Sequence, residues 1–346
     1  MKSPVVLTGA TGYLGSQILK NLLEKGYEVR ITTRNESKTA GENWLKPYLK
    51  EYIDKLSIHY GDLMEDGSFD EVMKGAKGLI HAASPFKIDG IKDAKKELIE
   101  PAKKGTRNVI QSAENAKTIT SIVVTSSVAA IYGDAIDIKL HDEGVFNEKH
   151  WNVTSSESHQ PYSFSKTEAE KEAWRLNDGK GWTLSTVNPG FILGPAVTDR
   201  DDSTSIQMVT NLLNGKFKQG VPDLYFSVVD VRDVAEAHVK ALEHEKSGRF
   251  ICTNKSLSLL QVADKLNEEV GHEFKKIPKK NLPTFLTYLV GPLMAGFSWP
   301  YLRKNLGVPV LFSNEKIREE LKIEFRPVNQ TLKDQAVQLK KDGVLK

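Results

Sequence analysis

Tyr162 and Lys166 are the two residues whose types and spacing point most directly to chemistry. They stand four residues apart in Tyr162-Ser163-Phe164-Ser165-Lys166, which places both on one face of a helix. A free tyrosine, with a pKa of about 10, is a poor acid at neutral pH, but a nearby ammonium favours the phenolate. We therefore expect Lys166 to lower the pKa of Tyr162. The phenol would then give a proton to a carbonyl oxygen as hydride reaches the carbonyl carbon. Such pairs also arise by chance on ordinary amphipathic helices.

Ser127 supplies the support that the pair needs. It follows Ile122-Val123-Val124-Thr125, a short apolar run that predicts a buried strand. Ligands of open parallel sheets bind outside the carboxyl ends of the strands. The Ser127 hydroxyl can donate a hydrogen bond that holds a substrate oxygen beside Tyr162. The alternative is a serine that only forms a turn or caps a helix.

A glycine-rich turn near the start of the chain predicts a dinucleotide site. Val5-Val6-Leu7 reads as a buried strand, residues 14–26 have helical apolar spacing, and the glycines lie between them. Gly9 allows a tight turn, Gly12 lets a pyrophosphate approach the backbone, and Gly15 lets the helix pack closely. The N–H groups at the helix start would face the phosphates. The residues of this turn that we assign to the cofactor are Gly9, Thr11, Gly12, Tyr13 and Leu14.

The end of the second predicted strand indicates which cofactor is bound. An acidic residue there selects NAD by bonding the free 2′-hydroxyl of the adenine ribose. Here residues 28–33 form the strand, and Arg34 follows it. Arg34 can grip a 2′-phosphate through two hydrogen bonds, with Lys38 as a second positive charge. Glu36, the one opposing acid, falls in the loop beyond the strand. The sequence therefore predicts NADP(H), unless Arg34 is only a solvated loop charge.

Strands and helices alternate along most of the chain. Further apolar runs at 56–60, 79–83 and 183–187 predict strands, and residues 91–116, with a boundary at Pro101, and 161–175 predict helices. This pattern predicts an α/β fold with a Rossmann-type, doubly wound parallel sheet and right-handed crossovers. Residues 191–220 and 255–307 interrupt it. We assign 1–188 and about 222–252 to a dinucleotide-binding domain. A smaller, interleaved substrate-binding domain would comprise about 189–221 and 253–346.

Composition narrows the class of protein. The 346 residues are 39% hydrophobic and 27% charged with a net charge of +3, so nothing in the overall charge favours nucleic acid or an anionic membrane. The single cysteine, Cys252, is expected to be a buried strand thiol. Together with the absence of a leader-like start, it suits the cytoplasm. Residues 286–302 are apolar but short for a membrane span and contain two prolines, so we expect two short helices there. We expect no metal, and either a monomer or a homodimer.

Several motifs, in order, resemble one known superfamily. The chain is similar to an extended short-chain dehydrogenase/reductase, and within it to the dihydroflavonol reductase-like branch, which includes NADPH-dependent aldehyde and ketone reductases. The likeness covers nearly the whole chain. The segments that carry it are Thr8-Gly9-x-x-Gly12-x-x-Gly15, Asp62-Leu63, His81-Ala82-Ala83-Ser84-Pro85, Thr125-Ser126-Ser127, Tyr162-x-x-x-Lys166, Asn188-Pro189-Gly190, residues 229–238 and residues 312–316.

The resemblance implies a role for each matching residue. Ser127, Tyr162 and Lys166 would form the catalytic triad, and Lys166 would also hold the nicotinamide ribose. The other implied cofactor contacts are Asp62 and Leu63 at the adenine, Ala82 and Ala83 along the ribose and phosphates, and Pro189, Gly190 and Ile192 at the nicotinamide. Asp62 could instead be a simple turn residue. His81 is expected to pack at a strand end.

One departure from the branch limits the substrate. Plant flavonoid reductases carry an asparagine five residues beyond the catalytic serine, and this chain has Tyr132 there. Flavonoid reduction is therefore not supported. Phe86, Tyr132, Phe164 and Phe191 are candidates to wall an apolar pocket for a small carbonyl substrate, and each could equally be a core residue.

Two other functions compete with carbonyl reduction. Sugar-nucleotide epimerases and dehydratases share the fold and the tyrosine–lysine pair. Dehydratases carry an Asp-Glu pair where this chain has Val128 and Ala129, and epimerases usually retain NAD. A non-catalytic NADP-binding sensor is the third possibility, and sensors often lack the tyrosine and lysine. The sequence favours the reductase.

Overall fold

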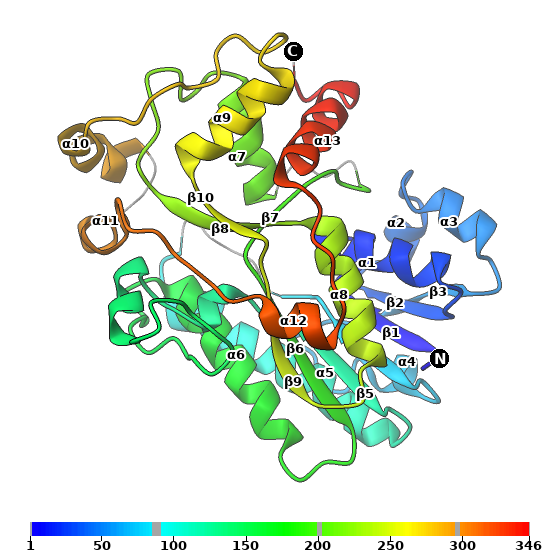
Figure 1. The fold of residues 1–346 in the computed structure, drawn as a ribbon. Helices are drawn as coiled ribbons and strands as arrows, with labels where there is room; N and C mark the ends of the chain where they lie inside the picture. The colour runs from blue at the N-terminus through cyan, green and yellow to red at the C-terminus, as the bar shows by residue number, and fades with distance from the viewer. Residues whose placement is uncertain (1, 85–90, 199–202, 295–297, 346) are drawn as a thin grey trace.

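The computed structural model describes residues 2–84, 91–198, 203–294 and 298–345. Its larger part is a parallel sheet with helices on both faces, and a smaller lobe lies over the carboxyl ends of the strands (Figure 1). The strand order is β3-β2-β1-β4-β5-β6-β9, and every pair is parallel. This confirms the predicted Rossmann-type fold.

The strands of the large sheet follow the apolar runs of the sequence. They are β1 (Val5–Thr8), β2 (Val29–Thr33), β3 (Leu56–Tyr60), β4 (Gly78–His81), β5 (Ser121–Thr125), β6 (Thr183–Pro189) and β9 (Gly248–Cys252). Val5, Leu7, Ile80 and Val123 are wholly buried, as in a sheet covered on both faces. The order reverses between β1 and β4, and such a switch point is where open α/β sheets bind ligands.

Helices cover both faces of this sheet. On one face α1 (Tyr13–Glu24) packs against α8 (Val231–Glu243), and α4 (Asp70–Met73), α5 (Glu100–Ala116) and α6 (Pro161–Asn177) cover the other. Two short helices, α2 (Glu36–Ala40) and α3 (Lys46–Glu51), flank the β2–β3 edge, and α12 (Glu315–Glu320) packs at β9. The expected boundary at Pro101 is present, because a π-helical turn, η1 (Lys95–Ile99), precedes α5.

Two glycines fix the turn between β1 and α1. Gly9 has a φ of +74°, and a Cβ there would lie 2.6 Å from the Ala83 nitrogen. A Cβ on Gly15 would lie 1.9 Å from the Gly9 carbonyl oxygen. A side chain at either position would therefore force the turn, α1 and the end of β4 apart, as expected for a tight, closely packed phosphate-binding turn.

The smaller lobe is built on a second, three-stranded sheet. Its strands are β7 (Phe191–Leu193), β8 (Tyr225–Asp230) and β10 (Lys255–Ser258), in the order β10-β8-β7. The helices α7 (Thr204–Leu213), α9 (Leu259–Val270) and α13 (Val328–Lys341) enclose its core. Segment 222–252, which we expected in the dinucleotide-binding domain, is thus divided: β8 lies in the small sheet, and β9 in the large one.

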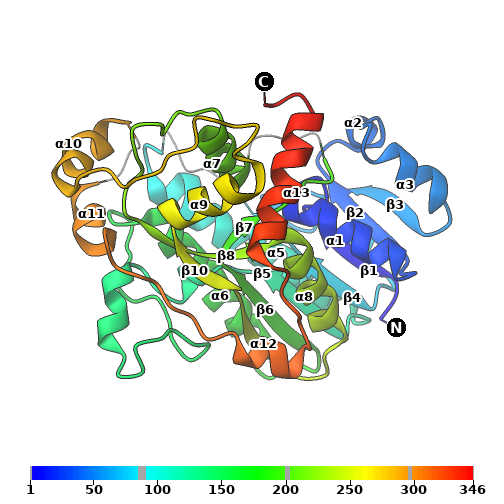
Figure 2. The ribbon, with the colours of Figure 1, turned by 45° about the horizontal axis from the view of Figure 1, so that its top comes forward.

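Residues 286–302 contribute to two short helices, as expected. They are α10 (Thr284–Met294) and α11 (Trp299–Asn305), at the end of the molecule opposite α3 (Figures 1 and 2). Among the described residues, no helix has the length and apolar character needed to cross a bilayer. Two 3₁₀ helices follow β5: η2 (Val128–Ala130) and η3 (Ala135–Leu140). The polar region 134–160 is therefore less irregular than its composition suggests, because it contains η3.

Candidate active site

Ser127, Tyr162 and Lys166 converge where β5 ends and α6 begins. Ser127 lies two residues beyond the end of β5 and caps η2, because its hydroxyl oxygen accepts a hydrogen bond of 3.1 Å from the Ala129 N–H. Pro161 occupies the first turn of α6, as predicted, so Tyr162 lies at the start of the helix and Lys166 one turn later. The Ser127 side chain is hydrogen bonded to the Tyr162 phenol. The Lys166 ammonium lies 5.9 Å from the centre of the Tyr162 ring.

The pKa of Tyr162 corrects one expectation. We expected Lys166 to lower it, but burial raises the pKa of Tyr162 to about 12, against a lowering effect from the Ser127 hydrogen bond. Burial also lowers the pKa of Lys166 to about 8, because an apolar environment disfavours its ammonium. In the protein without cofactor, Tyr162 is therefore a protonated phenol at neutral pH. This is the form that a proton donor requires.

Lys166 connects α6 to the segment that follows β4. Its ammonium donates a 3.1 Å hydrogen bond to the hydroxyl of Ser84, three residues beyond the end of β4. Nearby, the Ala83 N–H donates to the Thr8 hydroxyl at 3.1 Å. His81 completes this strand end: its Nδ1 bonds Thr8 at 2.8 Å, and burial lowers its pKa to about 3. His81 is thus a neutral packing residue.

The β1–α1 turn has the properties that a pyrophosphate site requires. No side chain caps α1 among the described residues, and its first turn contains no acidic residue, so its N–H groups and dipole remain for an anion. A Cβ on Gly12 would meet only the Gly9 carbonyl oxygen, at 3.3 Å. The Tyr13 hydroxyl donates to the Gly194 carbonyl at 2.7 Å, which fixes its ring against the smaller lobe. Thr11 and Leu14, the other assigned residues, are half-buried.

Arg34 lies at the carboxyl end of β2, beside the turn that follows β1. Its side chain is exposed. Lys38 is close in sequence on α2, which Asn35 caps by accepting the Lys38 N–H at 2.8 Å. We expected Glu36 in a loop, but it is the first residue of α2, because the Asn35 cap starts a helix there. The two basic side chains are therefore available to a 2′-phosphate.

The remaining residues predicted to contact the cofactor lie along the same edge of the sheet. Asp62 Oδ1 accepts the Met64 N–H at 2.8 Å, which is the turn role weighed for it, and the Leu63 carbonyl accepts a hydrogen bond from Asn108 at 2.9 Å. Their contact with adenine stays a prediction, as do the nicotinamide contacts. The other predicted contacts lie next to the site: Ala82 packs against Gly9, Pro189 ends β6, Gly190 follows it and Ile192 lies in β7.

The substrate candidates are not all in one place. Tyr132 packs against Phe146 and Phe312, with ring centres 5.3 and 5.5 Å away, so its ring belongs to an aromatic cluster. Phe191 opens β7 and packs against Phe226 at 5.3 Å. Phe86 lies outside the described residues. Lining of the pocket by these side chains stays a prediction.

Glu170 is a buried residue near the site that the motifs did not reveal. It lies one turn beyond Lys166 on α6, so the spacing of Tyr162, Lys166 and Glu170 could have identified it. Its carboxylate pairs with the buried Arg249 at 2.6 Å and accepts a 2.7 Å hydrogen bond from the Asn188 amide. Asn188 in turn donates to the Ser127 carbonyl at 3.1 Å. Glu170 therefore positions the backbone of Ser127.

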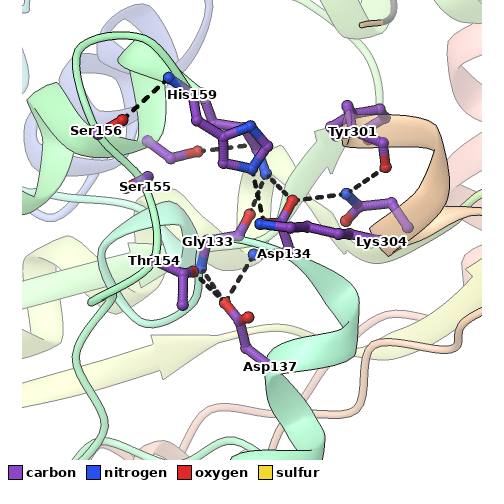
Figure 3. Close-up of polar contacts among 12 residues, drawn as sticks. Gly133, Asp134, Asp137, Thr154, Ser155, Ser156, His159, Tyr301 and Lys304 are labelled. Carbon is purple, nitrogen blue, oxygen red and sulfur yellow. Dashed lines mark hydrogen bonds and ion pairs between the residues drawn. The ribbon is translucent and has the colours of Figure 1, made fainter. Parts of the chain in front are cut away.

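Asp134 is the centre of a second buried network, shown in Figure 3. His159 and Gln160, which lead into α6, each donate to its carboxylate at 2.7 Å. From α11, Lys304 approaches at 3.0 Å and Asn305 donates at 2.8 Å. Burial raises the pKa of Asp134, but the hydrogen bonds from these partners outweigh it and leave the pKa below its ordinary value. These five residues, the Asp134 cluster, join the segment after Ser127 to the start of α6 and to α11.

The chain is similar in sequence and in fold to known reductases. The chain is similar to cinnamoyl-CoA reductase 2 of Medicago truncatula, 33% identical over 99% of this chain and 92% of that protein. Its fold is similar to that of Gre2 from Candida albicans in complex with NADPH, with a TM-score of 0.79 and 29% identity over 98% of both chains. It is also similar to the yeast methylglyoxal/isovaleraldehyde reductase Gre2 complexed with NADPH, with a TM-score of 0.78 and 27% identity over 98% of this chain and 99% of that one.

The sequence model of one family matches most of the large sheet and its helices. Residues 5–251 match the NAD dependent epimerase/dehydratase family, from β1 through most of β9. The match thus includes the glycine-rich turn, Ser127, Tyr162 and Lys166. The chain belongs to the NAD-dependent epimerase/dehydratase family, the extended short-chain dehydrogenases/reductases, and is an oxidoreductase of that family.

Proposed function

We propose that this enzyme reduces the carbonyl group of a small aldehyde or ketone with NADPH. The observation that carries the proposal is the hydrogen bond between Ser127 and a protonated Tyr162, beside Lys166 and next to the glycine-rich turn. NADPH, when bound, supplies the hydride. The relatives' names, which include a methylglyoxal/isovaleraldehyde reductase complexed with NADPH, support the same class of reaction.

Ser127 and Tyr162 both act on the carbonyl oxygen of the substrate, in different ways. Ser127 holds this oxygen by a hydrogen bond, and Tyr162 gives it the phenolic proton as the carbon receives hydride. The product is an alcohol, and Tyr162 is left as a phenolate. With a pKa of about 8, Lys166 is mostly an ammonium at neutral pH and stabilises this phenolate. The high pKa of Tyr162 in the free enzyme keeps the proton in place until then.

Tyr162→Phe tests the proposed proton donor. The variant keeps the ring but loses the proton, so we expect kcat to fall by about 10²–10⁴-fold, the usual contribution of a positioned acid. The dissociation constant of NADPH should stay close to that of the wild type. Tyr60→Phe, which alters an exposed tyrosine on β3, is the matched control and should leave both values unchanged.

A panel of aldehydes, ketones, dicarbonyls and a cinnamoyl thioester, followed by NADPH absorbance, defines the substrate class. Turnover by Tyr162→Phe at more than half the wild-type rate, with chemistry limiting, would refute the role of Tyr162. An enzyme that oxidised NADPH with none of these compounds, but interconverted nucleotide sugars, would instead be an epimerase.

A further inference from the structure

The positive charge of this protein is concentrated in one segment. Residues 274–314 contain no Asp or Glu, and they contain six basic residues: Lys275, Lys276, Lys279, Lys280, Arg303 and Lys304. Since the whole chain has a net charge of only +3, the other residues together are net acidic. The small net charge therefore conceals a strongly basic region.

The lysines before α10 are free to act on a partner. All four, Lys275, Lys276, Lys279 and Lys280, are exposed, and none forms an ion pair within the described parts of the chain. The loop that follows α7 extends this basic region, because Gly215 packs against the Lys276 side chain and Lys216 and Lys218 beside it are exposed.

Large apolar side chains are exposed directly after these lysines. Phe285 and Leu289 are one turn apart on α10 and are 70% and 60% exposed. Trp299, at the start of α11, is 51% exposed and stacks on Tyr288 with ring centres 5.9 Å apart. This stacking contact joins α11 to α10, so Trp299 lies beside the helix that carries Phe285 and Leu289. Both helices lie at the end of the molecule far from α3 (Figures 1 and 2).

We propose that this surface, formed by the four lysines, Phe285, Leu289 and Trp299, binds the face of an anionic lipid bilayer. Lysines beside protruding phenylalanine, leucine and tryptophan are the composition of peripheral membrane-binding surfaces. The lysines attract anionic headgroups, and the apolar side chains enter the boundary between headgroups and acyl chains. Such binding requires no membrane-spanning helix.

Two other occupants suit the surface less well. In a symmetric dimer the same patch faces itself, so the lysines of two copies would repel one another. Nucleic acid would satisfy the lysines, but it offers no apolar phase in which to bury Leu289 and Phe285. A bilayer satisfies both the charge and the apolar side chains.

Co-sedimentation of the full chain with vesicles tests the proposal. We expect binding to phosphatidylcholine vesicles that contain phosphatidylserine, little binding to phosphatidylcholine alone, and weaker binding at high salt. Lys279→Gln with Lys280→Gln should weaken binding about fivefold per lysine. Phe285→Ser with Leu289→Ser should weaken it by at least about tenfold.

Matched variants separate this surface from general effects. Lys46→Gln with Lys50→Gln, on α3, and Val337→Ser, on α13, alter exposed residues elsewhere and should bind as the wild type does. Circular dichroism confirms that each variant is folded. Equal binding to both kinds of vesicle, loss of binding in the control variants, or binding to single-stranded RNA without binding to vesicles would overturn the proposal. No substrate is present, so the result is independent of the proposed reductase activity.

Discussion

Asp134, seven residues after Ser127, and Lys304, on α11, form an ion pair of 3.0 Å between segments 170 residues apart in the chain. The carboxylate is wholly buried, and His159 and Gln160 bind it from the segment that starts α6. One side chain thus holds α11, the segment after Ser127 and the helix of Tyr162 together.

Asp134→Asn should therefore weaken both the fold and catalysis. The amide cannot accept from all these donors, and a hydrogen bond to a charged group contributes about 1.5–3 kcal/mol. We expect a decrease of that order in the free energy of unfolding, measured with urea at neutral pH. We also expect kcat to fall more than NADPH affinity, because Tyr162 loses its position.

The pH dependence distinguishes this pair from simple packing. Because the fold lowers the pKa of Asp134, its stabilisation is present above the ordinary aspartate pKa of about 3.9 and is lost as pH falls below it. The Asn variant should lose less stability than the wild type on acidification. Asp66→Asn, in an exposed ion pair with Lys104, should change stability by less than about 0.5 kcal/mol. Equal effects of the two substitutions would contradict the role of Asp134.

Arg34→Ala should alter the choice of cofactor. Loss of one charged hydrogen-bond donor to a phosphate costs about 1.5–3 kcal/mol, or roughly ten- to a hundredfold in NADPH affinity. NADH lacks that phosphate and should bind the variant almost as it binds the wild type. The measurement is the dissociation constant of each cofactor at fixed ionic strength, with Glu36→Gln as a control that removes the opposing charge. A wild-type preference for NADH, or equal losses for both cofactors, would exclude this role.

Lys166→Met should inactivate the enzyme and yet stabilise the cofactor-free fold. Folding lowers the pKa of this lysine from 10.5 to about 8, so the buried ammonium costs on the order of 3 kcal/mol at neutral pH. This cost is fully present below about pH 8 and disappears as pH rises through 10.5. The gain in thermal midpoint of the variant should be largest at neutral pH and should vanish near pH 11. A gain that did not depend on pH would point to better packing instead.

Replacement of Phe191 should alter substrate preference more than NADPH binding. The residue opens β7 directly after Gly190, where the chain leaves the large sheet for the smaller lobe. Phe191→Ala enlarges the predicted pocket, so bulkier carbonyls should gain in kcat/KM relative to small ones. Val153→Ala, at an exposed position, is the control. An unchanged ranking of substrates would remove Phe191 from the pocket.

Much of the large sheet could be predicted from sequence because several of its strands contain short apolar runs closed by glycine or polar residues. The runs at Val5-Val6-Leu7 and Ile122-Val123-Val124 have these properties. The short helix α2 was missed, since four of its five residues are polar and they carry no apolar period. The pairing of β8 with β10 was also missed, because three of the four residues in Lys255–Ser258 are polar and the segment resembles a loop.

The chemistry of the site was also only partly predictable from the sequence. Spacing alone places Tyr162 and Lys166 on one helical face, but it does not report how deeply that face is buried. Burial decided the pKa of Tyr162, which moved up rather than down. The partners of Glu170 and Asp134 lie far away in the chain, so no local pattern could reveal which residues pair with these two carboxylates.

The packing of Gly15 against the Gly9 carbonyl has a consequence for how this enzyme can diverge. Neither position accepts any other side chain without displacing backbone. We therefore expect both glycines of the predicted phosphate-binding turn to resist substitution. Arg34, at the next strand end, is exposed and can be replaced without disturbing the core. If Arg34 holds the 2′-phosphate as we propose, we expect a change of cofactor preference to arise by substitution at the end of β2. A library for redesign of this enzyme would best be randomised there.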